Sequence, residues 1–264
     1  MTIFKKEYNY FKEARRYFKK LHPGLSELKA KEYALKSLYE KMPSFEQKTR
    51  FLCFQADLEQ VSTHIYLENE ALYQFLKSIK KIDIQGFKNF VLLKHESLKH
   101  FDKITCTESS ELVTSHVFVV HTPNKRQEIV FSVGTTKSNS VLLTVHTINR
   151  SGFVYLKKDV DVDLSTVPEA LDTIYFCINL LIYTVTYPAR LVDYTERKAG
   201  AKLLKTAPEI LAPHSEAQGG HKTPHFRSGH FRYLGSPFFK NRQGSWVFVK
   251  SAVVGSAKLL KSHD

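Results

Sequence analysis

The chain has 264 residues, enough for one large domain or two small ones, and its apolar content of 42% is that of a folded protein. Its three cysteines, Cys53, Cys106 and Cys177, are scattered and odd in number, which excludes a disulfide framework and suits a reducing compartment. The sequence shows no apolar run long enough to cross a bilayer and no signal segment at its start. We therefore expect a cytoplasmic protein without a membrane partner.

The net charge of +13 is concentrated at the two ends of the chain. Residues 1–50 carry +7, residues 51–189 carry −2 and residues 190–264 carry +8. Because two basic ends attract polyanions, we expect nucleic acid or an acidic protein surface as the partner. The alternative is that the lysines only keep the protein soluble. No cofactor motif is recognisable, and we expect no cofactor.

The first third of the chain has the periodicity of helices. Apolar side chains recur three or four residues apart at Phe4, Tyr8, Phe11, Phe18 and Leu21, which predicts one buried helical stripe. A Pro-Gly pair then ends this helix. Further helices are predicted over residues 26–42, 46–64 and 69–80.

From about residue 112 the period changes to that of strands. Four short segments rich in Val, Ile, Phe and Thr are separated by turn residues, which predicts an antiparallel meander. The segments are 113–121, 128–133, 140–148 and 152–157. An apolar helix over 166–187, opened by a Thr cap, is expected at the centre of the core.

These elements predict an α+β fold, with N-terminal helices packed on an antiparallel β meander, a central apolar helix and a C-terminal β-hairpin. The predicted divisions are a helical region at 1–110, sheet plus core helix at 111–198, an extended arm at 199–224 and the hairpin at 225–264. We expect them to form one compact unit.

The first helix has two candidate binding faces. At 100° per residue, four basic side chains share one flank beside the apolar stripe, and two tyrosines lie together on another side. These residues are Lys5, Lys12, Arg16, Lys19, Tyr10 and Tyr17. Tyrosines among lysines can stack on bases or pack against a partner protein. The alternative is a solvated face with the tyrosines packed on a neighbouring element.

Histidine and arginine gather near the C-terminus, and four interpretations stay open. The residues are His214, His221, His225, His230, Arg227 and Arg232. Their spacing makes a zinc site a weak interpretation, and we expect no metal. A metal-independent ribonuclease would use His225, Arg227 and His230, but strand alternation separates them unless a bulge at Gly229 reunites them. The other interpretations are binding of an anionic partner through Arg227, His230 and Arg232, and a purely structural brace.

The same segment resembles a known family. Pro224, His225, Arg227, Gly229 and His230 match the motif Pro-His-x-Arg-Arg-Gly-His-Trp of type V-A anti-CRISPR proteins and their phage- and plasmid-borne relatives. Phe231 stands where the motif has Trp, and Ser228 replaces its second Arg. A Val-rich strand with an aromatic follows the motif in both, and the resemblance upstream is architectural only.

The resemblance implies an inhibitor encoded by a mobile genetic element and active in the host cytosol. The type V-A inhibitor is understood to suppress production of the CRISPR nuclease by recognising its nascent N-terminal peptide and promoting loss of the message. We accordingly expect an inhibitor that binds RNA, a nascent peptide or a protein–RNA assembly of the host CRISPR or translation machinery. The alternatives are a ribonuclease toxin and an interaction module with no role in nucleic-acid binding.

Overall fold

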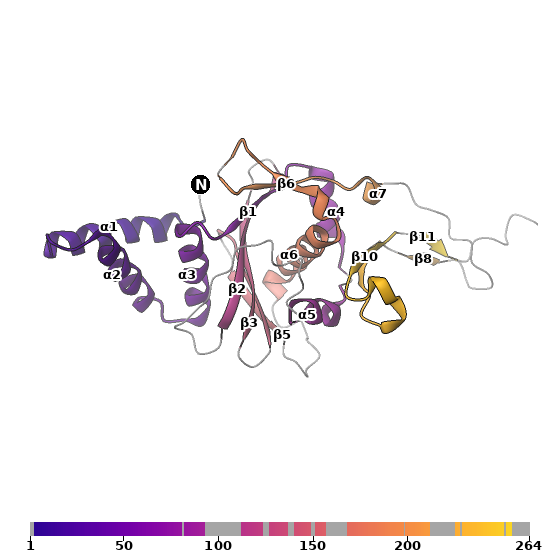
Figure 1. Cartoon of the computed structure of the whole chain (residues 1–264), viewed down its shortest axis with the longest axis horizontal. Coiled ribbons are helices and arrows are strands. Elements are labelled where there is room, and N and C mark those ends of the chain that lie inside the picture. The colour runs from indigo at the N-terminus through magenta and orange to yellow at the C-terminus, as the bar shows by residue number, and fades with distance from the viewer. Residues whose placement is uncertain are drawn as a thin grey trace, which may run out of the picture.

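A computed structural model describes residues 3–80, 82–92, 112–123, 127–136, 140–148, 151–156, 168–197, 199–211, 225–227, 229–250 and 252–254. Within these ranges a seven-stranded sheet lies between two layers of helices (Figure 1). The order of its strands is β5-β4-β3-β2-β1-β7-β6. The predicted α+β class is confirmed.

Four of the strands form the predicted antiparallel meander, and three others extend it. The strands are β1 (Thr63–Tyr66), β2 (Leu112–His121), β3 (Glu128–Thr136), β4 (Val141–His146), β5 (Ser151–Leu156), β6 (Leu191–Asp193) and β7 (Lys202–Leu204). β2 to β5 pair in sequence order as antiparallel neighbours. β1 is parallel to both β2 and β7, so the sheet is mixed.

Three helices lie on one side of the sheet: α1 (Lys5–Leu21), α2 (Glu27–Glu40) and α3 (Phe45–Leu58). Of these, α3 and the start of α1 lie nearest the strands (Figure 1). Ser26 and Ser44 cap α2 and α3 by accepting hydrogen bonds from backbone amides. The predicted stripe of α1 packs through Tyr8 and Phe11 on the buried Phe54, whose ring lies 5.0 Å from Tyr8 and 6.2 Å from Phe11. Leu21, predicted to lie in the same buried stripe, is instead 54% exposed. The far end of the α1–α2 pair points away from the sheet (Figure 1).

The opposite face is covered by α4 (Glu70–Ser78), α5 (Ile84–Leu92) and α6 (Pro168–Thr186). As predicted, α6 is apolar on most sides and buried. Its buried Asn179 donates hydrogen bonds to the carbonyls of Leu76 and Ile79, which have no partner within α4 because they lie at its C-terminal end. No helix in the described part of the chain is long and apolar enough to cross a membrane.

The C-terminal segment forms the predicted hairpin as two short paired sheets. Its strands are β8 (His225–Arg227), β9 (His230–Tyr233), β10 (Trp246–Val249) and β11 (Ala252–Val254), and β9 and β10 are joined by the 3-10 segment η5 (Pro237–Arg242). β9 pairs with β10 and β8 with β11, both antiparallel. Phe231 and Trp246 anchor this hairpin in the core beside α5 and α6.

Two sequence predictions need correction. The helix predicted over 46–64 ends at Leu58, and Gln60, with φ of 60°, turns the chain into β1. The 1–110 region is therefore not purely helical, because it contributes an inner strand. The arm predicted at 199–224 is not extended throughout, since β7 and the short helix α7 (Pro208–Leu211) occupy part of it. The remainder of that arm, 212–224, lies outside the described residues.

Candidate functional site

The histidines and arginines of the C-terminal hairpin lie on two separately paired strands. Arg227 of β8 pairs with Ala252 of β11, and His230 of β9 pairs with Val249 of β10. His230 and Arg232 are two positions apart on β9 and so share one of its faces. Ser228, which joins β8 to β9, and the side chains of His225 and Arg227 lie outside what the structure describes. The joint site, which needs a bulge at Gly229, stays a prediction.

The aromatic residue of the motif is a core residue. Phe231 is buried, and its ring lies 5.4 Å from Phe248 and 6.5 Å from Tyr183 of α6. Burial of a ring of this size stabilises the fold by about 2 kcal/mol. Part of the motif therefore fastens the hairpin to the body of the protein. Pro224, Ser228, His214 and His221 lie outside the described residues.

The loop between β9 and β10 presents an aromatic ring to solvent. Phe238 is 85% exposed, the largest value among the exposed large apolar residues that the structure describes. Next to it, the guanidinium of Arg232 lies 5.6 Å from the centre of the Phe239 ring. Lys240 and Arg242 in the same loop are exposed. The whole stretch 217–263 contains eight Lys and Arg residues and no Asp or Glu.

The loop is held in shape by its own hydrogen bonds. The amide of Gly244 donates to the carbonyl of Leu234 at 2.9 Å, and the amide of Phe239 donates to that of Ser236 at 3.1 Å. Lys240 has a φ of 39°, a region that L-residues rarely occupy and that carries strain of about 1–3 kcal/mol. A surface loop that retains a strained residue and an exposed phenyl ring is a candidate binding element.

The two predicted faces of α1 differ in how far their side chains are exposed. Lys5, Lys12 and Arg16 are exposed, whereas Lys19 forms an ion pair with Glu27 of α2. Tyr10 packs against α2, because its hydroxyl lies 3.1 Å from the Ser37 hydroxyl and the Lys41 ammonium lies 4.5 Å from its ring centre. Tyr17 remains 59% exposed. Tyr10 was therefore predicted to lie on a free surface, but in the structure it packs against α2.

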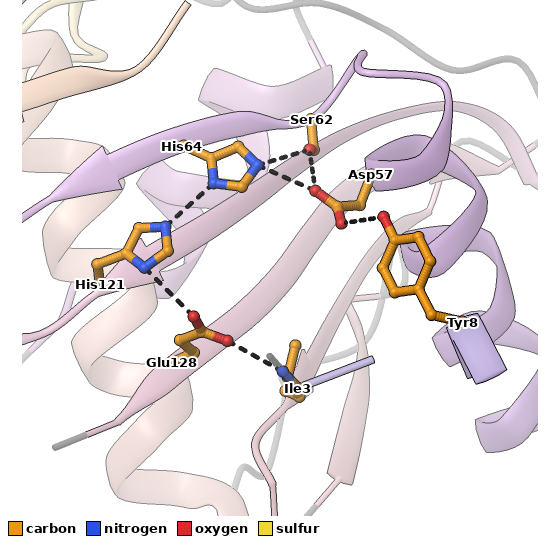
Figure 2. A network of polar contacts seen from close by, with 7 residues as sticks. All are labelled: Ile3, Tyr8, Asp57, Ser62, His64, His121 and Glu128. Atoms are coloured by element: carbon orange, nitrogen blue, oxygen red, sulfur yellow. Dashed lines mark hydrogen bonds and ion pairs between the residues drawn. The ribbon is translucent and has the colours of Figure 1, made fainter. Parts of the chain in front are cut away.

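A polar network that the sequence did not reveal connects the helical layer to the sheet (Figure 2). His64 Nε2 lies 3.0 Å from Asp57 Oδ1, and His64 Nδ1 lies 3.0 Å from His121 Nε2. His121 Nδ1 lies 3.6 Å from Glu128 Oε1. The second oxygen of Glu128 accepts a hydrogen bond from the backbone amide of Ile3 at 2.9 Å.

Asp57 joins three other side chains in this network. It accepts hydrogen bonds from the hydroxyls of Tyr8 at 2.8 Å and Ser62 at 3.2 Å, in addition to its contact with His64. Burial and the hydrogen bond to Asp57 raise the pKa of Tyr8 well above its usual range, so the phenol stays a donor. The carboxylate therefore ties α1, α3 and β1 together.

The tautomers of the two histidines decide how the network is bonded. Because a carboxylate only accepts, His64 donates to Asp57 from Nε2, and its Nδ1 then accepts from Nε2 of His121. Two neutral imidazoles therefore satisfy both of these 3.0 Å contacts. Nδ1 of His121 is left facing Glu128 at 3.6 Å, beyond the length of an ordinary hydrogen bond.

The same geometry argues against catalysis by this cluster. In a Ser-His-Asp triad, serine and aspartate contact opposite nitrogens of the histidine. Here Ser62 and Asp57 both contact Nε2 of His64, at 3.3 Å and 3.0 Å. All four ring nitrogens of the histidine pair already face a protein group, so none is left to act on a substrate. The network is structural.

Sequence signals for this network were weak. The strand that carries His64 has only four residues and follows a helix directly, so it was assigned to that helix. His64 and His121 lie 57 positions apart and meet only because β1 pairs with β2. Across the described residues, no group of three or more His, Cys, Asp or Glu side chains could hold a metal ion.

Comparison of the chain with family models, curated proteins and solved structures finds no match.

Proposed function

We propose that this protein acts by binding, and that the loop between β9 and β10 binds single-stranded RNA. The observation that carries the proposal is Phe238, which is 85% exposed in a loop with Lys240 and Arg242 and with no carboxylate nearby in the sequence. A water-exposed phenyl ring can stack on an unpaired base, while Lys and Arg contact the phosphates. Duplex RNA is disfavoured because its bases are already stacked on one another.

Preorganisation supports this assignment. The hydrogen bonds that hold the loop from Leu234 to Ser245 fix the position of Phe238 before a ligand arrives. Binding then orders few additional groups, so less of the stacking energy is lost as entropy. The absence of Asp and Glu from 217–263 also removes the repulsion that a carboxylate would exert on phosphate.

On the resemblance of the segment from Pro224 to Phe231, we further propose that the protein is a mobile-element-encoded inhibitor of the anti-CRISPR type. RNA binding through a basic surface would place it on a message or on a protein–RNA assembly of the host. The motif's second Arg is replaced by Ser228 in this chain. We therefore do not extend the proposal to the target of the type V-A inhibitor. The resemblance supports the lineage, and the loop supports the mode of action.

Binding of a short fluorescent oligouridine, followed by anisotropy at about 50 mM and about 200 mM salt, tests the RNA proposal. We expect Phe238→Ala to weaken binding about tenfold or more, since stacking on one base contributes about 1–3 kcal/mol. Phe238→Tyr retains the ring and is the matched control, which should bind like wild type. Arg242→Ala should reduce the salt dependence by about one phosphate contact.

Three results would contradict the proposal. Lack of binding at low salt would favour an interaction module with no role in nucleic-acid binding. Equal affinity of wild type and Phe238→Ala would move the RNA site elsewhere. Loss of full-length RNA in EDTA, abolished by His230→Ala, would favour the ribonuclease alternative.

A further inference from the structure

The α1–α2 pair carries an exposed apolar strip. Tyr10, Tyr17 and Leu21 follow one another along α1 at intervals of seven and four residues, so they share one side of the helix. Tyr10 meets Ser37 of α2, and Tyr33 lies one turn of α2 before Ser37. Tyr33 is therefore on the same side of the pair. We call the exposed Tyr17, Leu21 and Tyr33 the tyrosine face, and the packed Tyr10 borders it.

The tyrosine face is continuous and open. The rings of Tyr17 and Tyr33 lie 5.7 Å and 5.6 Å from the Phe18 ring between them. Tyr17 is 59% exposed, Leu21 54% and Tyr33 47%, and the end of the helix pair that bears them points away from the sheet (Figure 1). Most of the large apolar side chains that the described residues expose lie on this helix pair, since Leu28 is exposed there too.

Basic side chains surround this face. α1 has seven Lys and Arg residues against two Glu residues, and one of the two, Glu7, is buried against Arg50. Lys6 and Lys20 border the row of Tyr10 and Tyr17 by helical position, with the exposed Glu13 between them. Lys41 lies over the Tyr10 ring, so cations outnumber carboxylates around this face. An apolar strip rimmed by cations complements an apolar segment rimmed by carboxylates.

We propose that the tyrosine face is the docking site of a partner protein, which presents an acidic segment with apolar side chains. Tyrosine is the residue type enriched at the centre of protein interfaces, and two exposed tyrosines flank Phe18 here. RNA fits less well, because an exposed aliphatic residue such as Leu21 gains nothing from a base or a phosphate. A second copy fits less well too, because it would bring one basic helix against another.

This inference does not depend on the RNA site. The tyrosine face is on α1 and α2, which lie on one side of the sheet, whereas the β9–β10 hairpin packs on the other side with α6. The two surfaces would let one molecule join an acidic protein to an RNA strand.

Selection from a random peptide display library tests the proposal, with the full-length protein and its Tyr17→Glu/Tyr33→Glu variant as alternative baits. We expect peptides that bind only wild type to combine apolar residues with an excess of Asp and Glu. For a selected peptide, Tyr17→Ala should weaken binding about tenfold or more. Because these tyrosines are exposed, the variants should keep the wild-type circular dichroism and unfolding midpoint, which controls for folding. Phe238→Ala is the control outside the face and should bind the peptide like wild type.

Each other result would overturn the proposal. Peptides that are basic, or that bind both baits equally, would show that the face does not select an acidic partner. Failure to select any peptide would do the same. A drop in oligouridine affinity with Tyr17→Ala would assign the face to RNA. A dimer in sedimentation that Tyr17→Glu dissociates would assign it to a second copy.

Discussion

The two basic regions of the molecule hold their charge in different ways. In the helical layer, described cations meet carboxylates: Arg50 Nε donates to Glu7 Oε1 at 2.6 Å, and Lys19 pairs with Glu27. Within the C-terminal stretch 217–263 no such pairing is possible, because the stretch has no acidic residue of its own. Equal sign of charge therefore does not mean equal role. The first region uses part of its charge to build the fold, whereas the second leaves Lys240 and Arg242 exposed to solvent.

The histidine network sharpens this contrast. Asp57, His64, His121 and Glu128 alternate acid and base across the boundary between helices and sheet. Their polar groups contact one another inside the protein, so they are engaged in the fold. Arg242 and Lys240 are exposed instead, so their charges contribute to the electrostatic field around the protein.

The largest expected effect is loss of the buried ion pair of the helical layer. Arg50→Ala removes the contact with Glu7, the hydrogen bond from its Nη2 to the carbonyl of Ile3 and the cation–π contact with Phe4. We expect a loss of about 3 kcal/mol in the free energy of unfolding, because Glu7 is left buried without its partner. Urea unfolding measures this, with the exposed Arg16→Ala as control. Equal stability of Arg50→Ala and Arg16→Ala would show that the paired charge of the helical layer does not stabilise the fold more than an exposed charge does.

The next effect depends on pH. His146 is buried beneath the helical layer, where burial and the nearby charge of Arg50 lower its pKa to about 3. The unfolded state, with a pKa of about 6.5, binds more protons below that value, so stability falls as pH falls. His146→Leu should abolish this loss, which amounts to about 1.4 kcal/mol per pH unit between about pH 6.5 and about pH 4.5.

Urea unfolding at several pH values compares His146→Leu with wild type and with the exposed-residue control His22→Gln. Parallel curves for wild type and His146→Leu would show that His146 is accessible to protons in the folded state.

A third substitution tests the polar network. Asp57→Asn leaves one acceptor oxygen where Tyr8, Ser62 and His64 all require one. We expect a loss of about 2 kcal/mol in the free energy of unfolding, since at least one buried donor loses its partner. Ser62→Ala, which removes only the weakest of these contacts, should cost less than about 1 kcal/mol. A lower melting temperature for Ser62→Ala than for Asp57→Asn would show that the carboxylate of Asp57 is not the main stabilising group of the network.

The smallest effect is expected in the hairpin, with the opposite sign. Lys240→Gly relieves the positive φ of 39° and should stabilise the protein by up to about 1 kcal/mol, while removing one cation from the RNA loop. In calorimetry the melting temperature of Lys240→Gly should therefore rise, while its affinity for oligouridine should fall. Loss of stability with unchanged RNA affinity would show that Lys240 belongs to the fold and not to the binding surface.

Local sequence patterns predicted the elements that repeat a simple period. The α1 stripe of Phe4, Phe11 and Phe18, the meander β2 to β5 and the buried helix α6 each follow from three- and four-residue or alternating spacing. β1 was missed because four residues carry too little periodicity to be distinguished from the preceding helix. Its place beside β2 depends on pairing Thr63 with Phe118, a relation that no local pattern contains.

The same distinction applies to the candidate sites. Residue types alone reveal the C-terminal stretch without acidic residues, and helical position reveals that Tyr17 and Leu21 share one side of α1. The exposure of Phe238 could not be predicted, because it results from a turn whose hydrogen bonds and positive φ at Lys240 depend on the whole loop. The histidine network required tertiary pairing, and Tyr10 was misjudged because α2 covers that side of α1.

The position of β1 between two parallel neighbours has a consequence for how the chain folds during synthesis. Its first neighbour, β2, begins at Leu112, and its second, β7, ends only at Leu204. Both pairings are of high contact order, so β1 has at least one open edge until most of the polypeptide has left the ribosome. Assembly of the sheet around β1 is therefore a late step, and premature termination before residue 202 would expose an unpaired, aggregation-prone strand edge.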